Sequence, residues 1–340
     1  MLLIWPAVSL VLWKRLDPAR ALIWTILGGY LIMPQLTAIN LPVLPELDKV
    51  TIPNLAALFG ARLVRGDRFR LLPTGLLGRM LVLLFIFSPI GTVLTNGAVA
   101  VQPGVVLPAI PITDIASMVI GKAIDMIPFL LARHYLGNAD GNRAIIEALV
   151  LGGLIYSLPI LLESALSPQL HRWIYGFHQH DFFQTMRQGG YRPMVFLEHG
   201  LWVAFFTLMA LLSALVRVKT AEVDTRARAI AVFLYLGLML MLCKSAGVLV
   251  YAVVGCPLIF LTRWRMQVCV AAVLATMVTL YPVMRGAHLV PVEQIVGFAR
   301  GYSEDRADSL KFRFDNEELL LAHAQERGLF GWGGYERNLL

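Results

Sequence analysis

Two arginines flank a glycine pair in the segment RQGGYRP, where Arg187 and Arg192 stand on either side of Gly189 and Gly190. Glycine lets a backbone approach a ligand closely, and a guanidinium group matches the geometry of a phosphate while it keeps its charge. The segment therefore indicates a loop that binds a phosphate group. The alternative is a pair of solvated loop arginines that contact lipid headgroups.

Glu198 and His199 follow in the same stretch, just inside an apolar run that begins near residue 194. An ionisable residue at membrane depth is costly, so it indicates a function or a specific partner. His199 is a candidate general base, and Glu198 a candidate for orienting a neighbouring group. Alternatively, His199 is an interfacial histidine that bonds to a neighbouring helix.

Four more residues are candidates for binding the same ligand. Lys244, in LCKSAG, stands between two apolar runs, where a lysine either reaches the surface or faces an anion. Arg313, in KFRF, alternates with aromatic residues, which is also typical of a structural amphipathic position. Trp332 and Tyr335 lie beside glycines in GWGGYERN, where they either stack on sugar rings or anchor the chain at a membrane interface.

The sequence gives no indication of a metal site. Three histidines, His171, His178 and His180, lack a regular ligand spacing, and the chain has no His-Glu-x-x-His or Asp-x-Asp element. We therefore expect neither a metal nor another cofactor. Lys122 and Asp125 stand three residues apart in an apolar run, as either an intrahelical ion pair or part of a transporter's polar relay.

The composition places these residues in a membrane protein. Of the 340 residues, 58% are hydrophobic and only 15% are charged, whereas soluble domains average roughly 45–50% and about 25%. The net charge of +7 is concentrated in short loops between apolar runs, so we expect membrane lipids and not nucleic acid as partners.

Apolar runs give about ten candidate membrane spans. They cover residues 1–13, 21–33, 50–64, 79–95, 113–132, 144–162, 194–216, 229–243, 246–261 and 266–283. The 50–64 run is crowded by prolines and is a candidate re-entrant segment. Two of the runs, separated by Lys244, predict a tight helical hairpin. The expected fold class is all-α, a polytopic transmembrane helical bundle of about ten spans with two outward-facing loop segments.

Basic residues occupy alternate loops between these runs, and the positive-inside rule places such loops in the cytoplasm. These residues are Lys14, Arg15, Arg20, Arg62, Arg65, Arg68, Arg70, Arg133, Arg143, Arg217, Lys219, Arg226, Arg228, Arg263 and Arg265. The remaining loops, of which 163–193 is a large one, then face outward.

The division expected from this pattern is a transmembrane helical domain over 1–283, which includes the outer loop 163–193, and an outward-facing C-terminal segment over 284–340. Asp315 with Glu318 has the spacing of a capping box, which predicts a helix start. Gly328 predicts the end of that helix.

Three stretches in this order, YGF…Q…RQGGYRPMVFLEHGL, LCKSAG and LFGWGGYERN, resemble the bacterial O-antigen ligase and polymerase superfamily. Those membrane proteins handle exopolysaccharides on lipid carriers, and the resemblance runs from about residue 144 to the end of the sequence. It implies a multi-spanning helical protein of the bacterial inner membrane, with its main loops facing the periplasm or the cell exterior.

The resemblance also implies an activity, that of a metal-independent glycosyltransferase. A glycan linked to undecaprenyl pyrophosphate is transferred on the outer face to a sugar hydroxyl of an acceptor glycan or lipid, by ligation or by polymerisation. Without a metal, arginine and lysine must offset the charge on the pyrophosphate leaving group. Arg192 matches the family's arginine before a membrane helix, and Lys244 matches a basic position by charge alone. Arg187 and Arg313 are further candidates without a motif match.

Two other classes remain open, a transporter or flippase and a non-catalytic accessory membrane protein. A transporter should place its polar groups near mid-membrane and often shows inverted repeats. An accessory protein would need no outer cluster of basic residues.

The sequence departs from the resemblance after the glycine-aromatic stretch. Members usually supply a histidine from an outer segment there, followed by further spans, and this sequence has neither. We therefore expect a shortened member that is inactive alone, in which His199 is the first candidate to replace the missing base.

The orientation predicted from the basic loops can be tested by thiol labelling. In a background free of the native cysteines Cys243, Cys256 and Cys269, Gln188→Cys should react with a membrane-impermeant thiol reagent in intact spheroplasts. Thr225→Cys should react only after the membrane is permeabilised. The reverse pattern would contradict the orientation and, with it, an outward-facing site.

Overall fold

The structure of the chain is a computed structural model. It describes all residues except 43, 69–71, 103–104, 188, 302–303, 335–336 and 339–340, and it does not describe the side chains of 102, 105, 187, 305 and 306.

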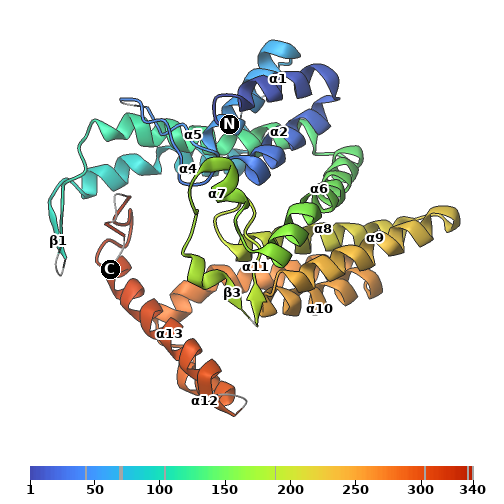
Figure 1. Cartoon of the computed structure of the whole chain (residues 1–340). Coiled ribbons are helices and arrows are strands. Elements are labelled where there is room, and N and C mark those ends of the chain that lie inside the picture. The colour runs from blue at the N-terminus through green and yellow to red at the C-terminus, as the bar shows by residue number, and fades with distance from the viewer. Residues whose placement is uncertain are drawn as a thin grey trace. The chain divides into compact units, whose positions relative to one another are not determined.

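Helices make up most of the described chain, and the strands form two short antiparallel hairpins (Figure 1). The first helices are α1 (Trp5–Arg15), α2 (Pro18–Ile32), α3 (Thr51–Phe59) with its π-helical continuation η1 (Gly60–Val64), α4 (Leu76–Thr95), α5 (Asp114–Tyr135) and α6 (Ala139–Leu166). They are followed by α7 (Leu170–Tyr175), the 3-10 helix η2 (Phe182–Thr185), α8 (Gly200–Thr220), α9 (Val223–Leu242) and α10 (Ala246–Leu261). The last helices are α11 (Trp264–Gly286), α12 (Val292–Arg300) and α13 (Glu304–Gln325). The strands are β1 (Ala100–Gln102), β2 (Val105–Leu107), β3 (Met186–Arg187) and β4 (Gly190–Tyr191).

The chain forms two compact units. The first consists of Met1–Val82 and Gly121–Arg263, and the second of Leu83–Ile120 and Trp264–Leu340. The predicted division at residue 283 concerns the membrane boundary and stays a prediction.

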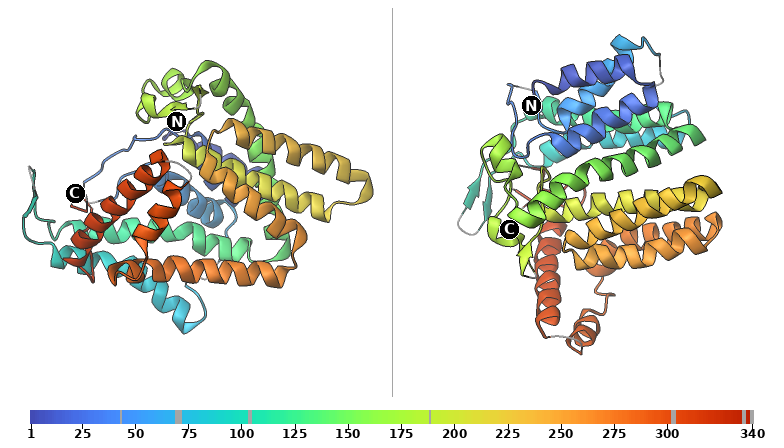
Figure 2. Two further views of the ribbon diagram at one scale, coloured as in Figure 1. Left: turned by 90° about the horizontal axis from the view of Figure 1, so that it is seen from below. Right: turned by 45° about the vertical axis from the view of Figure 1, so that its right-hand side comes forward.

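The core of the first unit is built around α8. This helix packs against α6, α9 and α10, which lie beside it (Figure 2). Its buried side chains include Val203, Phe206 and Leu211, which belong to one continuous apolar core. Small residues permit the close approach of α6 and α8, because a Cβ on Gly153 would lie 2.5 Å from the Cβ of Ala210.

A second core in the same unit lies under α1, α2 and α3. Trp13 is fully buried there, among Ala21, Leu22 and Ala57. The indole lies directly on Gly60, the first residue of η1, where a Cβ would collide with the ring. The 50–64 run forms α3 and η1 without a break. Pro53 lies in the first turn of α3, where it does not interrupt the helix.

The second unit holds its C-terminal residues by side-chain bonds to backbone carbonyls. Thr92 donates to the carbonyl of Phe330 at 2.8 Å, and Asn96 donates to that of Gly331 at 2.9 Å. Arg337 is fully buried and donates to the carbonyls of Pro108 at 2.7 Å and Ala98 at 3.1 Å. These bonds fix Phe330, Gly331 and Arg337 within the second unit.

Six helices of the described chain, α4, α5, α6, α8, α9 and α11, are long and apolar enough to cross a membrane. Three shorter apolar helices, α2, α3 with η1, and α10, have 10–17 residues. The prediction of an all-α helical membrane protein agrees with this arrangement, and each predicted apolar run contains a helix. The predicted total of ten spans is not confirmed.

Two helix starts differ from the prediction. The 194–216 run was expected to be helical throughout, but α8 begins only at Gly200, and the residues before it have irregular backbone. Asp315 does not start a helix, because α13 already begins at Glu304. The end predicted before Gly328 is confirmed, since α13 ends at Gln325.

The turn predicted at Lys244 is confirmed, with α9 ending at Leu242 and α10 starting at Ala246. After this turn α10 packs mainly against α8 instead of α9. Lys244 itself has a positive φ of 47°, a backbone conformation that reverses the chain direction within few residues.

The contact between α6 and α8 gives a test of this packing. Gly153→Ala should lower the melting temperature of the purified protein, because overpacking a helix contact costs about 1–3 kcal/mol. Adding Ala210→Gly should restore it, because the second change removes the methyl group that the first one meets.

Gly237→Ala is the matched control. Its added Cβ meets only Leu211 Cδ1, at an ordinary 3.8 Å, while the gain in helix propensity is the same. A Gly153→Ala protein that melts like the wild type would contradict the close contact.

Candidate functional site

The residues between the β3–β4 hairpin and α8 form an irregular segment, 193–199, whose backbone is bound by side chains from other parts of the chain. Glu163, near the end of α6, accepts through Oε2 from the backbone N–H of Met194 at 2.8 Å and of Val195 at 2.7 Å. Its Oε1 accepts from the N–H of Leu170 at 3.0 Å, and the side chain is only 1% exposed. A carboxylate, which has only acceptors, matches these three donors.

Three further side chains complete this binding. Gln179 donates to the carbonyls of both Val195 and Leu197 at 3.1 Å. Gln35 donates to the carbonyl of Phe196 at 3.2 Å, and the hydroxyl of Tyr156 accepts from the backbone N–H of Phe196 at 3.1 Å. Buried irregular backbone is stable only when its polar groups are paired in this way.

Val195 shows how strongly the segment is constrained. Its φ is 53°, a left-handed conformation that a β-branched residue seldom adopts and that costs on the order of 1–3 kcal/mol. Glu163 binds its N–H and Gln179 binds its carbonyl, so both neighbouring peptide groups are fixed. The surrounding side chains therefore impose this conformation.

Arg192 lies at the start of this segment and is buried, with 4% of its surface exposed. Its backbone N–H donates to the carbonyl of Thr185 at 2.8 Å. Its side-chain Nη2 donates to the hydroxyl of Ser245 at 3.4 Å. The side chain runs over Gly200, where a Cβ would lie 2.7 Å from Nε. Glycine at the first residue of α8 is thus required for the arginine to take this path.

Lys244 reaches the same place from the turn between α9 and α10. Its Nζ lies against Gly190, where a Cβ would collide with it. Gly190 is two residues before Arg192, and Ser245 directly follows Lys244, so the structure brings the two predicted cations together. The glycine at 190 is therefore needed for the close approach of Lys244, while the predicted approach of a ligand stays a prediction.

The N-terminus of α10 adjoins the two cations. Ser245 is its N-cap residue, but its side chain makes no capping bond to the helix. Ala246 and Gly247 are exposed, and the space around Gly247 is open. The first N–H groups of a helix attract anions. The arrangement can therefore bind a phosphate group with two side-chain cations and a helix terminus.

The sequence predicts Glu198 and His199 inside a membrane helix. In the structure both residues lie before α8. His199 is the N-cap of α8, and its Nδ1 accepts from the N–H of Leu201 at 3.1 Å. In a neutral imidazole the other nitrogen then carries the proton, so Nε2 is a donor. The ring lies 4.9 Å from that of His180.

Glu198 lies close enough to the buried amine of Lys49 to affect its titration. Lys49 donates to the carbonyl of Tyr30 at 3.0 Å and is 8% exposed. Burial lowers the pKa of Lys49 to about 8, although the negative charges of Glu198 and Asp48 oppose this shift. Lys49 was not anticipated from the sequence, where it follows an acidic residue in an ordinary loop.

The other predicted site residues are not brought to this place by the described contacts. Arg187 pairs with Gly190 through the backbone of β3, but its side chain is outside the description. Arg313 is exposed on α13, in the second unit. Tyr335 lies outside the described residues.

Trp332 has neighbours within the second unit that cover part of its ring. Its Nε1 donates to the carbonyl of His323 at 2.7 Å, and the two rings stack with centroids 4.4 Å apart. The guanidinium group of Arg327 lies over the indole at 4.9 Å. Sugar stacking on this ring stays a prediction. A sugar would have to contact the part of the indole that His323 and Arg327 do not cover.

Two further residues discussed from the sequence have defined partners in the structure. Lys122 and Asp125 form an intrahelical ion pair at 3.2 Å on α5. His171 serves the local fold, since its Nε2 accepts from the N–H of Gln35 at 3.3 Å while its Nδ1 lies 2.8 Å from the carbonyl of Phe177. Among the described residues, no group of three His, Cys, Asp or Glu side chains is placed to hold a metal ion.

Glu163→Gln tests the central hydrogen bonds of the segment. An amide has one acceptor oxygen, so at least one buried N–H would face an NH₂ group, at a cost of about 1–3 kcal/mol. We expect a lower melting temperature and faster hydrogen exchange at the amides of Met194 and Val195. Glu147→Gln, on the same helix but with 44% of its side chain exposed, is the control and should change neither. Unchanged exchange at Val195 in Glu163→Gln would contradict this role.

Comparisons of the chain with models of protein families, with curated proteins and with solved structures find no match.

Proposed function

We propose that the protein is a membrane glycan ligase or polymerase of the O-antigen type. It would transfer a saccharide from an undecaprenyl-pyrophosphate carrier to an acceptor sugar hydroxyl. The observation that supports this proposal best is the meeting of Arg192 and Lys244 beside the N-terminus of α10.

Electrostatics makes a multiply charged anion the suitable ligand. Two cations held near each other repel, and an anion with two or more charges relieves this repulsion for both. The pyrophosphate that departs from the glycan gains negative charge during transfer, and groups already in position stabilise it without reorganisation. Arg192, which is buried against Gly200 and bonded to the hydroxyl of Ser245, is positioned in this sense.

The hydrogen bonding of the two neighbouring residues gives them different roles in the proposal. His199 accepts from the N–H of Leu201 through Nδ1, so in the neutral ring Nε2 carries the proton and the ring is a donor. Glu198 is the acceptor of the pair and the candidate base for the acceptor hydroxyl. The buried amine of Lys49 lies close enough for its pKa to respond to the charge of Glu198.

Binding of undecaprenyl pyrophosphate to the purified protein tests the proposal without requiring turnover. Arg192→Ala and Lys244→Gln should each weaken binding by about tenfold or more, because a hydrogen bond to a charged group contributes about 1.5–3 kcal/mol. Arg192→Lys should recover little, since one ammonium group cannot reproduce the planar guanidinium. Arg172→Ala, an exposed arginine of the same 163–193 segment, is the control and should bind normally.

Variants are compared only where their melting temperatures match the wild type. Lys244 is half-buried at a turn, so Lys244→Gln provides the comparison if Arg192→Ala does not fold. Equal affinity of wild type and folded variants for undecaprenyl pyrophosphate would refute the proposal. The glycan profile of a deletion strain then separates the two activities. Short unpolymerised units indicate a polymerase, and full-length free polymer indicates a ligase.

A further inference from the structure

A cavity lies within the first unit where α6 begins, α8 ends and α9 begins. Its volume is about 640 Å³, which is in the range of roughly 300–1,000 Å³ found for ligand clefts. Arg143 from α6, Arg217 from α8 and Arg228 from α9 line it, together with Asn142 and Thr225. Each of the three helices thus contributes one arginine.

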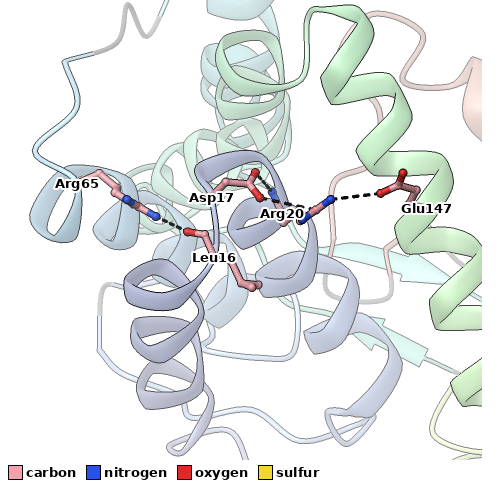
Figure 3. A network of polar contacts seen from close by, with 5 residues as sticks. All are labelled: Leu16, Asp17, Arg20, Arg65 and Glu147. Carbon is pink, nitrogen blue, oxygen red and sulfur yellow. Dashed lines mark hydrogen bonds and ion pairs between the residues drawn. The ribbon is translucent and has the colours of Figure 1, made fainter.

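The charge in this cavity is strongly positive. Glu147 is the acidic residue among its lining residues, and it is paired with Arg20 at 3.4 Å (Figure 3). Among the described residues, no carboxylate forms an ion pair with Arg143, Arg217 or Arg228.

A neighbouring cavity of about 470 Å³ shares Arg143 and Glu147 but also contains the acidic residues Asp17 and Asp140. Of these two cavities, the one with the three arginines therefore carries the excess of positive charge.

The loops that the positive-inside rule places in the cytoplasm meet near this cavity. Lys219 donates to the carbonyls of Ile259 at 2.6 Å and Thr262 at 3.1 Å, which joins the end of α8 to the end of α10. Arg65 donates to the carbonyl of Leu16, which joins the loops after η1 and α1 (Figure 3). By that rule the cavity lies at the level of the lipid headgroups of the cytoplasmic leaflet.

We propose that this cavity binds a phosphate-bearing anion, of the kind carried by the headgroup of an anionic membrane lipid. Guanidinium groups form bidentate bonds to phosphate oxygens, and three of them converge here from three helices. Basic pockets between membrane helices on the cytoplasmic side accept such headgroups. This site is separate from the cluster of Arg192 and Lys244, and it does not depend on the proposed glycan transfer.

The test compares two triple variants of the purified protein that lose the same charge. One changes the cavity, with Arg143→Gln, Arg217→Gln and Arg228→Gln. The other changes exposed arginines of the same basic loops that do not line the cavity, with Arg15→Gln, Arg226→Gln and Arg263→Gln. Binding is measured to vesicles of phosphatidylglycerol and of phosphatidylcholine, and to inorganic phosphate.

We expect the wild type and the control triple to bind phosphatidylglycerol alike, with weaker binding to phosphatidylcholine. The cavity triple should lose at least about tenfold in affinity, the equivalent of one charged hydrogen bond. Displacement of the lipid by millimolar inorganic phosphate would identify a soluble phosphate as a ligand of the same cavity.

Equal loss in both triples would overturn the proposal, because it would assign binding to the general positive charge. Equal affinity of the cavity triple and the wild type would overturn it as well. All three cavity arginines are exposed, so the variant should fold, which its melting temperature verifies. If it does not fold, Arg217→Gln against Arg226→Gln provides the same comparison.

Discussion

The hydrogen bonds of the Glu163 carboxylate are the constraint on which the rest of the site depends. A backbone that leaves regular structure next to a membrane helix cannot turn to water for its polar groups, so the protein must supply their partners. Glu163 supplies two of these bonds, to Met194 and Val195, and a third to Leu170 at the start of α7. Together with Gln179 it holds Val195 in a left-handed conformation. This geometry sets where the irregular segment ends and α8 begins, and therefore where Arg192 and His199 lie.

Each apolar run in the sequence contains a helix, whereas the short helices α7 and α12 lie outside the runs and were not predicted. The turn at Lys244 and the end of α13 before Gly328 were also predictable, because a charge or a glycine marks them locally. The start of α8 was not. Residues 194–197 are apolar, and apolar residues of an irregular segment cannot be distinguished from those of a helix when remote side chains bind the backbone. The helix start predicted at Asp315 was wrong for a related reason, because this capping-box spacing occurs inside a helix that starts earlier.

The residue types of the candidate site could be predicted from the sequence, but the contacts between these residues could not. Arginine and lysine near glycines indicated Arg192 and Lys244, and the structure brings both together. Glu163, like Glu198, is a carboxylate at the edge of an apolar run. Nothing in the sequence, however, indicates that it binds Val195, which lies 32 residues away. Lys49 carried no signal, because its burial depends on Tyr30 and on the segment before α8.

The two cationic clusters of the first unit lie at opposite ends of α8. Arg192 lies against the first residue of this helix, and Arg217 lines the cavity near its last turn. A helix of 21 residues spans about 30 Å, which is also the thickness of a hydrocarbon core. Between its ends α8 buries two hydroxyl side chains, those of Thr207 and Ser213, and the hydroxyl of Thr207 bonds to the carbonyl of Val203 on the same helix. The two proposed anion sites therefore lie about one hydrocarbon thickness apart along α8, one at each end of this mostly apolar helix.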